Sequence, residues 1–160
     1  MRITTILVPL DGSGLAETAL RPAVELAREH RAALVLLRAV EAHTGPMADP
    51  IQAQVDAVRG AEEYLASVRG RVTQSGVANV DTSVWYGPAA EAIVEAAQFR
   101  KADLIVMSSH GRSGVGRLVL GSIAETVLRA TRVPILLIRP GEAPVDVPFM
   151  PRTAKEVARV

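Results

Sequence analysis

The feature that most constrains the fold of this chain is the alternation of short apolar runs with longer amphipathic segments. Five runs have the length of a strand, and Ala33–Val40 is apolar almost throughout, which is typical of a strand buried on both faces of a parallel sheet. The other four strands are predicted at residues 3–9, 79–85, 104–107 and 133–138. The run at 79–85 alternates between apolar and polar residues, which places it nearer an edge of the sheet.

Segments between these runs carry apolar residues at steps of three and four, the period of a helix packed on one face. Ser13 is placed to cap the first helix, Gly76 to end the second, and Ser122 with Glu125 has the spacing of a capping box. Strands and helices in alternation predict parallel βαβ units with right-handed crossovers, and so a Rossmann-like, three-layer, doubly wound α/β fold. The helices are predicted at residues 15–30, 51–76 and 89–99 and from Gly121-Ser122 onward.

Composition excludes several classes of function. The 160 residues suffice for one domain, and with 49% apolar and 3% aromatic residues its core must be aliphatic. A net charge of +1 gives no field that would favour nucleic acid or an anionic membrane, and the absence of cysteine excludes disulfides and thiolate chemistry. We find no signal-peptide core and no membrane-length apolar run, so we expect a cytoplasmic protein with a domain at 1–140 and a Pro-rich tail at 141–160.

Two turns are chemically unusual. Residues 11–14 follow the first strand, and the Gly-rich residues 108–116 follow the fourth. With strand order 3-2-1-4-5 the two turns are neighbours where the order reverses, which is where open α/β sheets bind ligands. The Asp11 carboxylate can accept hydrogen bonds from ribose hydroxyls or an adenine amine, while Gly111, Gly121 and Ser122 offer backbone donors and a hydroxyl to phosphates. We therefore expect one crevice that holds a nucleotide.

These residues also have simpler interpretations. Asp11 can be a turn or helix-capping residue, Ser122 can satisfy its own helix, and His110 can be a loop residue bonded to backbone. The sequence contains neither G-x-x-x-x-G-K-[ST] nor G-x-G-x-x-G, so neither a Walker site nor a dinucleotide fingerprint is predicted. The three histidines are too scattered to define a metal site, and we assign no catalytic residue.

Three stretches together resemble the universal stress protein family. They are VPLDGS at 8–13, Ser-His-Gly at 109–111 followed after nine residues by Gly121-Ser122, and RVPILLIRP at 132–140. In the nucleotide-binding branch of that family the motif is Gly, two residues, Gly, nine residues, Gly, then Ser or Thr, and here Ser108 replaces the first Gly. If this position requires positive φ, or a backbone without a Cβ against the ligand, serine is unfavourable there. If it requires only a small residue, serine is harmless.

The resemblance extends over about residues 3–140 and implies the five-stranded sandwich, usually as a homodimer. It also implies a ligand, ATP with Mg²⁺ or Mn²⁺ on its phosphates, with AMP or ADP as alternatives. Pro9, Leu10, Asp11 and Val40 would surround adenine and ribose. The positions implied for ribose and phosphates are Met107, Ser108, His110, Gly111, Gly121, Ser122 and Ile123.

The last predicted strand, residues 133–138, also indicates a partner. At the edge of the sheet this apolar strand would expose unpaired backbone groups, and pairing with its copy about a two-fold axis would cover them. The alternative is that the tail at 141–160 folds back over the edge.

Our leading hypothesis is an ATP-binding stress-response or regulatory protein that acts as a nucleotide-dependent homodimeric switch. Turnover should be slow at most, because no general base or arginine finger can be identified. One alternative is a dimerisation or interaction module of the same fold that binds no nucleotide. A less favoured one is a slow nucleotidyl or phosphoryl transferase.

Overall fold

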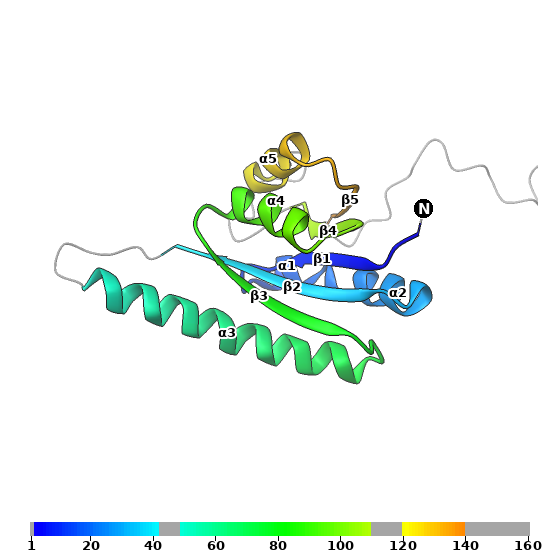
Figure 1. Cartoon of the computed structure of the whole chain (residues 1–160), viewed down its shortest axis with the longest axis horizontal. Coiled ribbons are helices and arrows are strands. Elements are labelled where there is room, and N and C mark those ends of the chain that lie inside the picture. The colour runs from blue at the N-terminus through cyan, green and yellow to red at the C-terminus, as the bar shows by residue number, and fades with distance from the viewer. Residues whose placement is uncertain (1, 42–48, 110–119, 140–160) are drawn as a thin grey trace, which may run out of the picture.

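The computed structural model describes residues 2–41, 49–109 and 120–139, which form a five-stranded parallel sheet between two layers of helices (Figure 1). The strand order is β3-β2-β1-β4-β5, so the predicted doubly wound topology is confirmed. The strands are β1 (Thr5–Pro9), β2 (Ala33–Val40), β3 (Val80–Tyr86), β4 (Leu104–Ser108) and β5 (Ile135–Ile138). The helices are α1 (Gly14–Glu17), α2 (Leu20–His30), α3 (Pro50–Gln74), α4 (Ala89–Phe99) and α5 (Ser122–Ala130).

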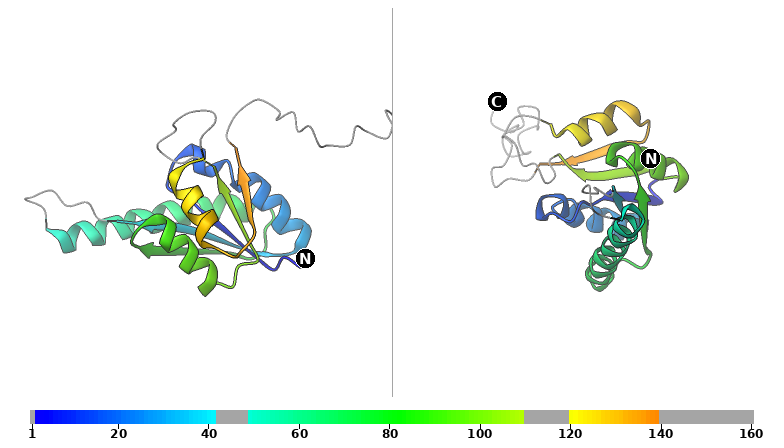
Figure 2. Two further views of the ribbon diagram at one scale, coloured as in Figure 1. Left: turned by 90° about the horizontal axis from the view of Figure 1, so that it is seen from above. Right: turned by 90° about the vertical axis from the view of Figure 1, so that its left-hand side faces the viewer.

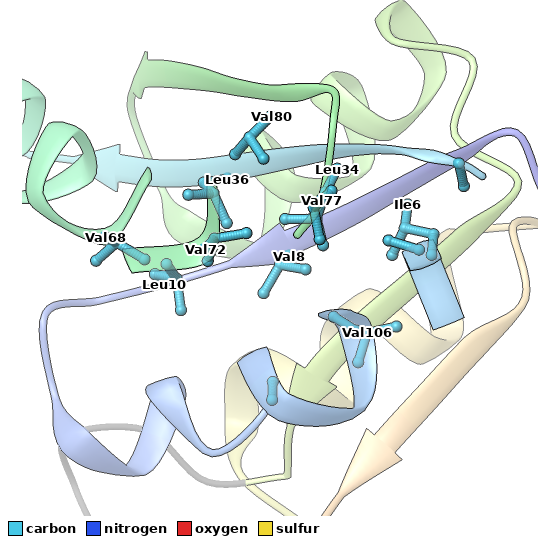
Figure 3. Packing of buried hydrophobic residues seen from close by; sticks show 14 of the residues in the cluster. Ile6, Val8, Leu10, Leu34, Leu36, Val68, Val72, Val77, Val80 and Val106 are labelled. Carbon is cyan, nitrogen blue, oxygen red and sulfur yellow. The ribbon is translucent and has the colours of Figure 1, made fainter. Parts of the chain in front are cut away.

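The core is concentrated on the three central strands. Eight of the eleven largest fully buried side chains belong to β1, β2 and β4, which explains why these strands read as continuous apolar runs. On one face of the sheet they pack against α2 and α3, as the close view of the labelled side chains from β1, β2 and α3 shows (Figure 3). On the other face they pack against α4 and α5. Fully burying each aliphatic side chain contributes roughly 1.5–3 kcal/mol, so these strands anchor the domain.

The two outer strands differ from the central ones. β3 pairs with β2 alone, and all its residues after Val80 are at least partly exposed, which confirms the predicted edge position. β5 forms the opposite margin, beside α5 (Figure 2), and none of its four apolar residues is buried in the monomer. An apolar edge strand of this kind needs a cover, as the sequence predicted.

The predicted single helix at 15–30 is wrong in one respect, because the structure divides it into α1 and α2. Pro22 explains the break. A proline cannot donate to the carbonyl four residues earlier, here that of Thr18, and its ring would clash with that carbonyl in a continuous helix. The Thr18 hydroxyl instead donates to the carbonyl of Leu15 (2.6 Å), and Pro22 lies in the first turn of α2, where its missing N–H costs nothing.

Other helix ends agree with the sequence. Ser13 is the N-cap of α1, and its hydroxyl accepts a hydrogen bond from the Ala16 amide (3.1 Å). Gly76, with φ of +91°, follows α3 and allows the chain to turn there.

No helix in the described ranges is both long and apolar enough to cross a bilayer. The tail predicted at 141–160 and most of the Gly-rich turn predicted at 108–116 lie outside the described residues.

Candidate functional site

A pocket of about 340 Å³ lies where β1 and β4 end, at the reversal of strand order. Asp11 of the first turn and Ser108 and Ser109 of the second therefore line one pocket, although β1 and β4 are far apart in the chain. This volume is within the usual range of small-molecule sites, roughly 300–1,000 Å³. Its lining residues are Pro9, Leu10, Asp11, Ala16, Ala39, Ala89, Ile93, Met107, Ser108, Ser109, Gly121, Ser122, Ile123 and Ala124.

The turn after β1 is held by its own side chains. The Asp11 carboxylate accepts a hydrogen bond from the Ser13 amide through Oδ1 (2.8 Å), so the simpler interpretation of Asp11 as a turn residue is correct. Asp11 also lines the pocket, and a carboxylate can accept several hydrogen bonds. Gly12 between them has φ of +84°, a conformation that strains any residue with a Cβ. The turn role of Asp11 and a binding role are therefore compatible.

Ser108, the last residue of β4, and Ser109, which follows it, both line the pocket, and each is 7% exposed. Ser108 is a strand residue in register with Ile138, so its backbone is extended and does not require glycine. Ser108 is also absent from the residues with positive φ, so its backbone carries no strain of the left-handed kind. The Ser109 carbonyl accepts a hydrogen bond from the Gly121 amide (2.9 Å), which joins the end of β4 to the start of α5.

The N-terminus of α5 faces the pocket through Gly121, Ser122 and Ile123. The predicted start at Gly121-Ser122 is confirmed, but the predicted capping box is wrong. Gly121 is the N-cap, Ser122 is the first helical residue, and the Glu125 side chain accepts a hydrogen bond from Arg129 instead (2.8 Å). The Glu125 amide makes the first hydrogen bond of the helix itself, to the carbonyl of the N-cap Gly121. The amides of residues 122–124 therefore have no acceptor within α5.

Eight of the eleven site residues predicted from sequence line this pocket: Pro9, Leu10, Asp11, Met107, Ser108, Gly121, Ser122 and Ile123. Val40, the last residue of β2, is buried and lies outside the lining set, which contains its neighbour Ala39 instead. His110 and Gly111 lie outside the described residues.

Sequence reasoning missed six lining residues. Most are alanines without chemical character, and what they share is a place at or near the C-terminal end of a strand or the start of a helix. Ala39 is the penultimate residue of β2, and Ala89 is the first residue of α4, directly after Gly87-Pro88. Their positions at the ends of predicted elements could have indicated them. The missed residues are Ala16, Ala39, Ala89, Ile93, Ser109 and Ala124.

The described lining of the pocket is mostly uncharged. Among the lining residues that the structure describes, Asp11 is the only acidic or basic one, and the others are small, apolar or hydroxyl-bearing. Within the described part of the chain, no three His, Asp or Glu side chains are grouped so that they could hold a metal ion. The site thus combines an apolar crevice, one carboxylate and a helix N-terminus, which suits an uncharged ring joined to an anionic group.

Fold and site together define a doubly wound α/β protein with a ligand pocket at its topological switch point. Comparison with known proteins then gives the family. The model of the universal stress protein family matches residues 2–139, and the chain belongs to this family. A Staphylococcus epidermidis protein that carries the universal stress protein name is 32% identical over 152 residues, which cover 93% of this chain and 90% of the relative.

Solved structures agree with this assignment. The universal stress protein UspA from Lactobacillus plantarum superposes with a TM-score of 0.76 at 28% identity, covering 87% of this chain and 99% of that protein. A universal stress protein in complex with cAMP has a TM-score of 0.68 at 24% identity, with 88% and 100% covered. One from Archaeoglobus fulgidus in complex with dAMP has a TM-score of 0.64 at 21% identity, with 86% and 98% covered. The last two share the fold with this chain.

Proposed function

We propose that this protein binds an adenine nucleotide, ATP in the first place and AMP or ADP as alternatives, in the pocket between β1, β4 and α5. The observation that carries the proposal is the junction of the Asp11 turn and the α5 N-terminus in one cavity of suitable volume. Relatives solved with cAMP and with dAMP support it, since both ligands combine an adenine base with a phosphate.

The pocket residues divide naturally between the parts of such a ligand. Adenine fits the apolar part formed by Leu10, Ala39 and Ile93, and the Asp11 carboxylate can accept hydrogen bonds from the ribose hydroxyls. The amides at the start of α5 and the Ser122 hydroxyl can donate to phosphate oxygens, favoured by the positive end of the helix dipole. Because Ser122 does not cap α5 with its side chain, its hydroxyl is not committed to that role.

A divalent cation, Mg²⁺ or Mn²⁺, would be held mainly by the phosphates. The described residues offer no cluster of carboxylates or histidines for it, and Mg²⁺ commonly keeps several waters and binds through substrate phosphates. We therefore expect the cation to strengthen ATP binding more than AMP binding, because ATP brings more phosphate oxygens.

Equilibrium dialysis with labelled ATP tests the proposal directly. We expect saturable binding at millimolar ATP or below, and Asp11→Ala should weaken it about tenfold, since hydrogen bonds to charged groups contribute roughly 1.5–3 kcal/mol. Asp11→Asn keeps an oxygen for the Ser13 amide and separates loss of the charge from loss of the turn.

Asp49→Ala is the matched control, because Asp49 accepts a hydrogen bond from the Ile51 amide (2.9 Å) and caps α3 in the same manner as Asp11 holds its turn. It should lower the melting temperature without changing affinity. Absence of saturable ATP binding by the unmodified protein would favour the interaction module without a nucleotide. Product formed over many turnovers, and lost in Asp11→Ala, would favour the transferase.

We further infer that the protein is a homodimer joined through β5 and works in the cytoplasm as a stress-response switch whose bound and free states partners distinguish. Backbone geometry supports the dimer. The carbonyls of Pro134 and Ile138 accept hydrogen bonds from β4, so the backbone groups of Ile135 and Leu137 point toward the outer edge of the sheet. No described strand pairs with that edge.

A further inference from the structure

A cluster of four side chains lies next to the Asp11 turn (residues 11–14), which is the binding turn of the proposed site. Its members come from α1, β2 and α3. At its centre the Glu17 carboxylate accepts a hydrogen bond from the Tyr64 hydroxyl (2.9 Å) and two from Arg71, at 2.9 Å to Oε2 and 3.0 Å to Oε1. The guanidinium of Arg38 lies over the Tyr64 ring, 5.0 Å from its centroid. We call Glu17, Arg38, Tyr64 and Arg71 the Glu17 cluster. None of the four lines the pocket.

The Glu17 cluster touches the binding turn at two points. A Cβ on Gly12 would lie 3.4 Å from both terminal nitrogens of Arg38, so the guanidinium packs between the turn and the Tyr64 ring. Glu17 is the last residue of α1, whose residue Ala16 lines the pocket and donates its amide to the Ser13 hydroxyl. The cluster thus supports the same short segment that presents Asp11.

α1 needs such support, because a helix of four residues is not stable alone. The Glu17 ion pair suits this task better than the exposed pairs of the molecule. The Glu17 and Arg71 side chains are 24% and 56% exposed, whereas those of the Arg21–Glu25 pair on α2 are 88% and 63% exposed. A partly buried, two-pronged arginine–carboxylate pair loses less to water and fixes direction as well as distance.

The ionisation of Glu17 agrees with this geometry. The pKa of Glu17 lies below its usual value, and the hydrogen bond from Arg71 is the largest cause. Burial raises this pKa, and the hydrogen bond from Tyr64 lowers it further. Tyr64 is half-buried beside the carboxylate, and its pKa is raised by burial and by its hydrogen bond to Glu17. At neutral pH the cluster therefore consists of an ionised Glu17 bonded to a neutral phenol and to the Arg71 guanidinium, with the Arg38 guanidinium over the phenol ring.

We propose that Glu17 is a positioning residue of the nucleotide site, holding α1 and the Asp11 turn in the binding geometry through Tyr64 and Arg71. This inference rests on the function proposed above. Without the cluster the pocket keeps all its lining residues, but the turn samples geometries in which Asp11 and the α5 N-terminus no longer engage one ligand together. Affinity falls although no contact to the ligand has been removed.

Three substitutions test the role, each measured by equilibrium dialysis with labelled ATP well below the melting temperature. Glu17→Gln removes the charge, Arg71→Met removes the two-pronged pair, and Tyr64→Phe removes one hydrogen bond but keeps the ring under Arg38. We expect ATP affinity to fall about threefold to tenfold in the first two and about twofold to fivefold in Tyr64→Phe, as for loss of one or two hydrogen bonds. Arg71→Lys should recover part of the affinity, because it keeps the charge without the fork.

Asp103→Asn is the control for stability. Asp103 joins β1 to β4 at the end of the sheet away from the pocket, so its substitution should lower the melting temperature and leave ATP affinity unchanged. A merely structural Glu17 cluster would behave like Asp103, with a lower melting temperature and unchanged affinity, and that result would overturn the inference.

Amide hydrogen exchange provides a second measurement that does not depend on nucleotide. Exchange at the Ser13 and Ala16 amides, which report the turn and the α1 cap, should be at least threefold faster in the three cluster variants and unchanged in Asp103→Asn. Unchanged exchange in the cluster variants would overturn the inference even if ATP binds. Faster exchange in a protein that binds no ATP would support the positioning of the turn and reject the proposed function.

Discussion

At the scale of single residues, Asp103 shows how one carboxylate can hold two strands. Its Oδ2 accepts hydrogen bonds from the Thr4 amide (2.8 Å), the Thr4 hydroxyl (2.7 Å) and the Thr5 amide (3.0 Å). β1 and β4 pair directly, so this carboxylate links the beginnings of the two strands, at the end of the sheet opposite the pocket. The hydrogen bond from the Thr4 hydroxyl is the largest cause that lowers the pKa of Asp103, followed by those from the two amides.

A pH-dependent stability follows from this lowered pKa. Because the folded protein binds the Asp103 proton more weakly than the unfolded chain, the contribution is present above the ordinary carboxyl pKa of 3.8 and is lost as pH falls through the folded value. Thermal unfolding should give a lower melting temperature for Asp103→Asn at pH 7, and the difference should shrink as the pH is lowered below about 4. A difference that stays constant down to pH 2 would contradict this assignment.

At the scale of elements, the end of α2 carries avoidable strain. Arg31 follows the helix with φ of +53°, in the left-handed region, where a residue with a Cβ is penalised. Arg31→Gly should raise the free energy of unfolding by about 0.5–1 kcal/mol, because relief of the strain outweighs the added flexibility of the unfolded chain. Urea titration measures this change, and Arg28→Gly, inside the same helix, is the contrasting control, which should destabilise by a similar amount.

At the scale of the whole molecule, the prediction concerns assembly. Leu136, at the centre of β5, is 37% exposed in the monomer, and a lysine there should oppose pairing of this edge with a second copy. Light scattering after size exclusion should give the mass of a dimer for the unmodified protein and of a monomer for Leu136→Lys. Ile51→Lys, at an apolar side chain of α3 that is 75% exposed, should leave the dimer intact. A dimeric Leu136→Lys would locate the interface elsewhere.

The sequence by itself determined the strands, the strand order and most of the described residues that line the pocket of this universal stress protein. Apolar runs and helical periods are local signals, and βαβ units of one hand leave few topologies, so Asp11 and Ser122 could be brought together before any coordinates. Pro22 is also a sequence signal for the interruption between α1 and α2, but the apolar residues continue at helical spacing across it and favoured a single helix.

Only the tertiary structure decided how these parts are supported. Whether Ser122 caps its helix, whether Ser108 is strained, and which alanines line the pocket depend on backbone geometry at places where the sequence carries no distinctive signal. The Glu17 cluster is the clearest case, because its four residues come from α1, β2 and α3 and have no common motif. Contacts between residues distant in the chain are set by packing, and packing is a property of the folded molecule as a whole.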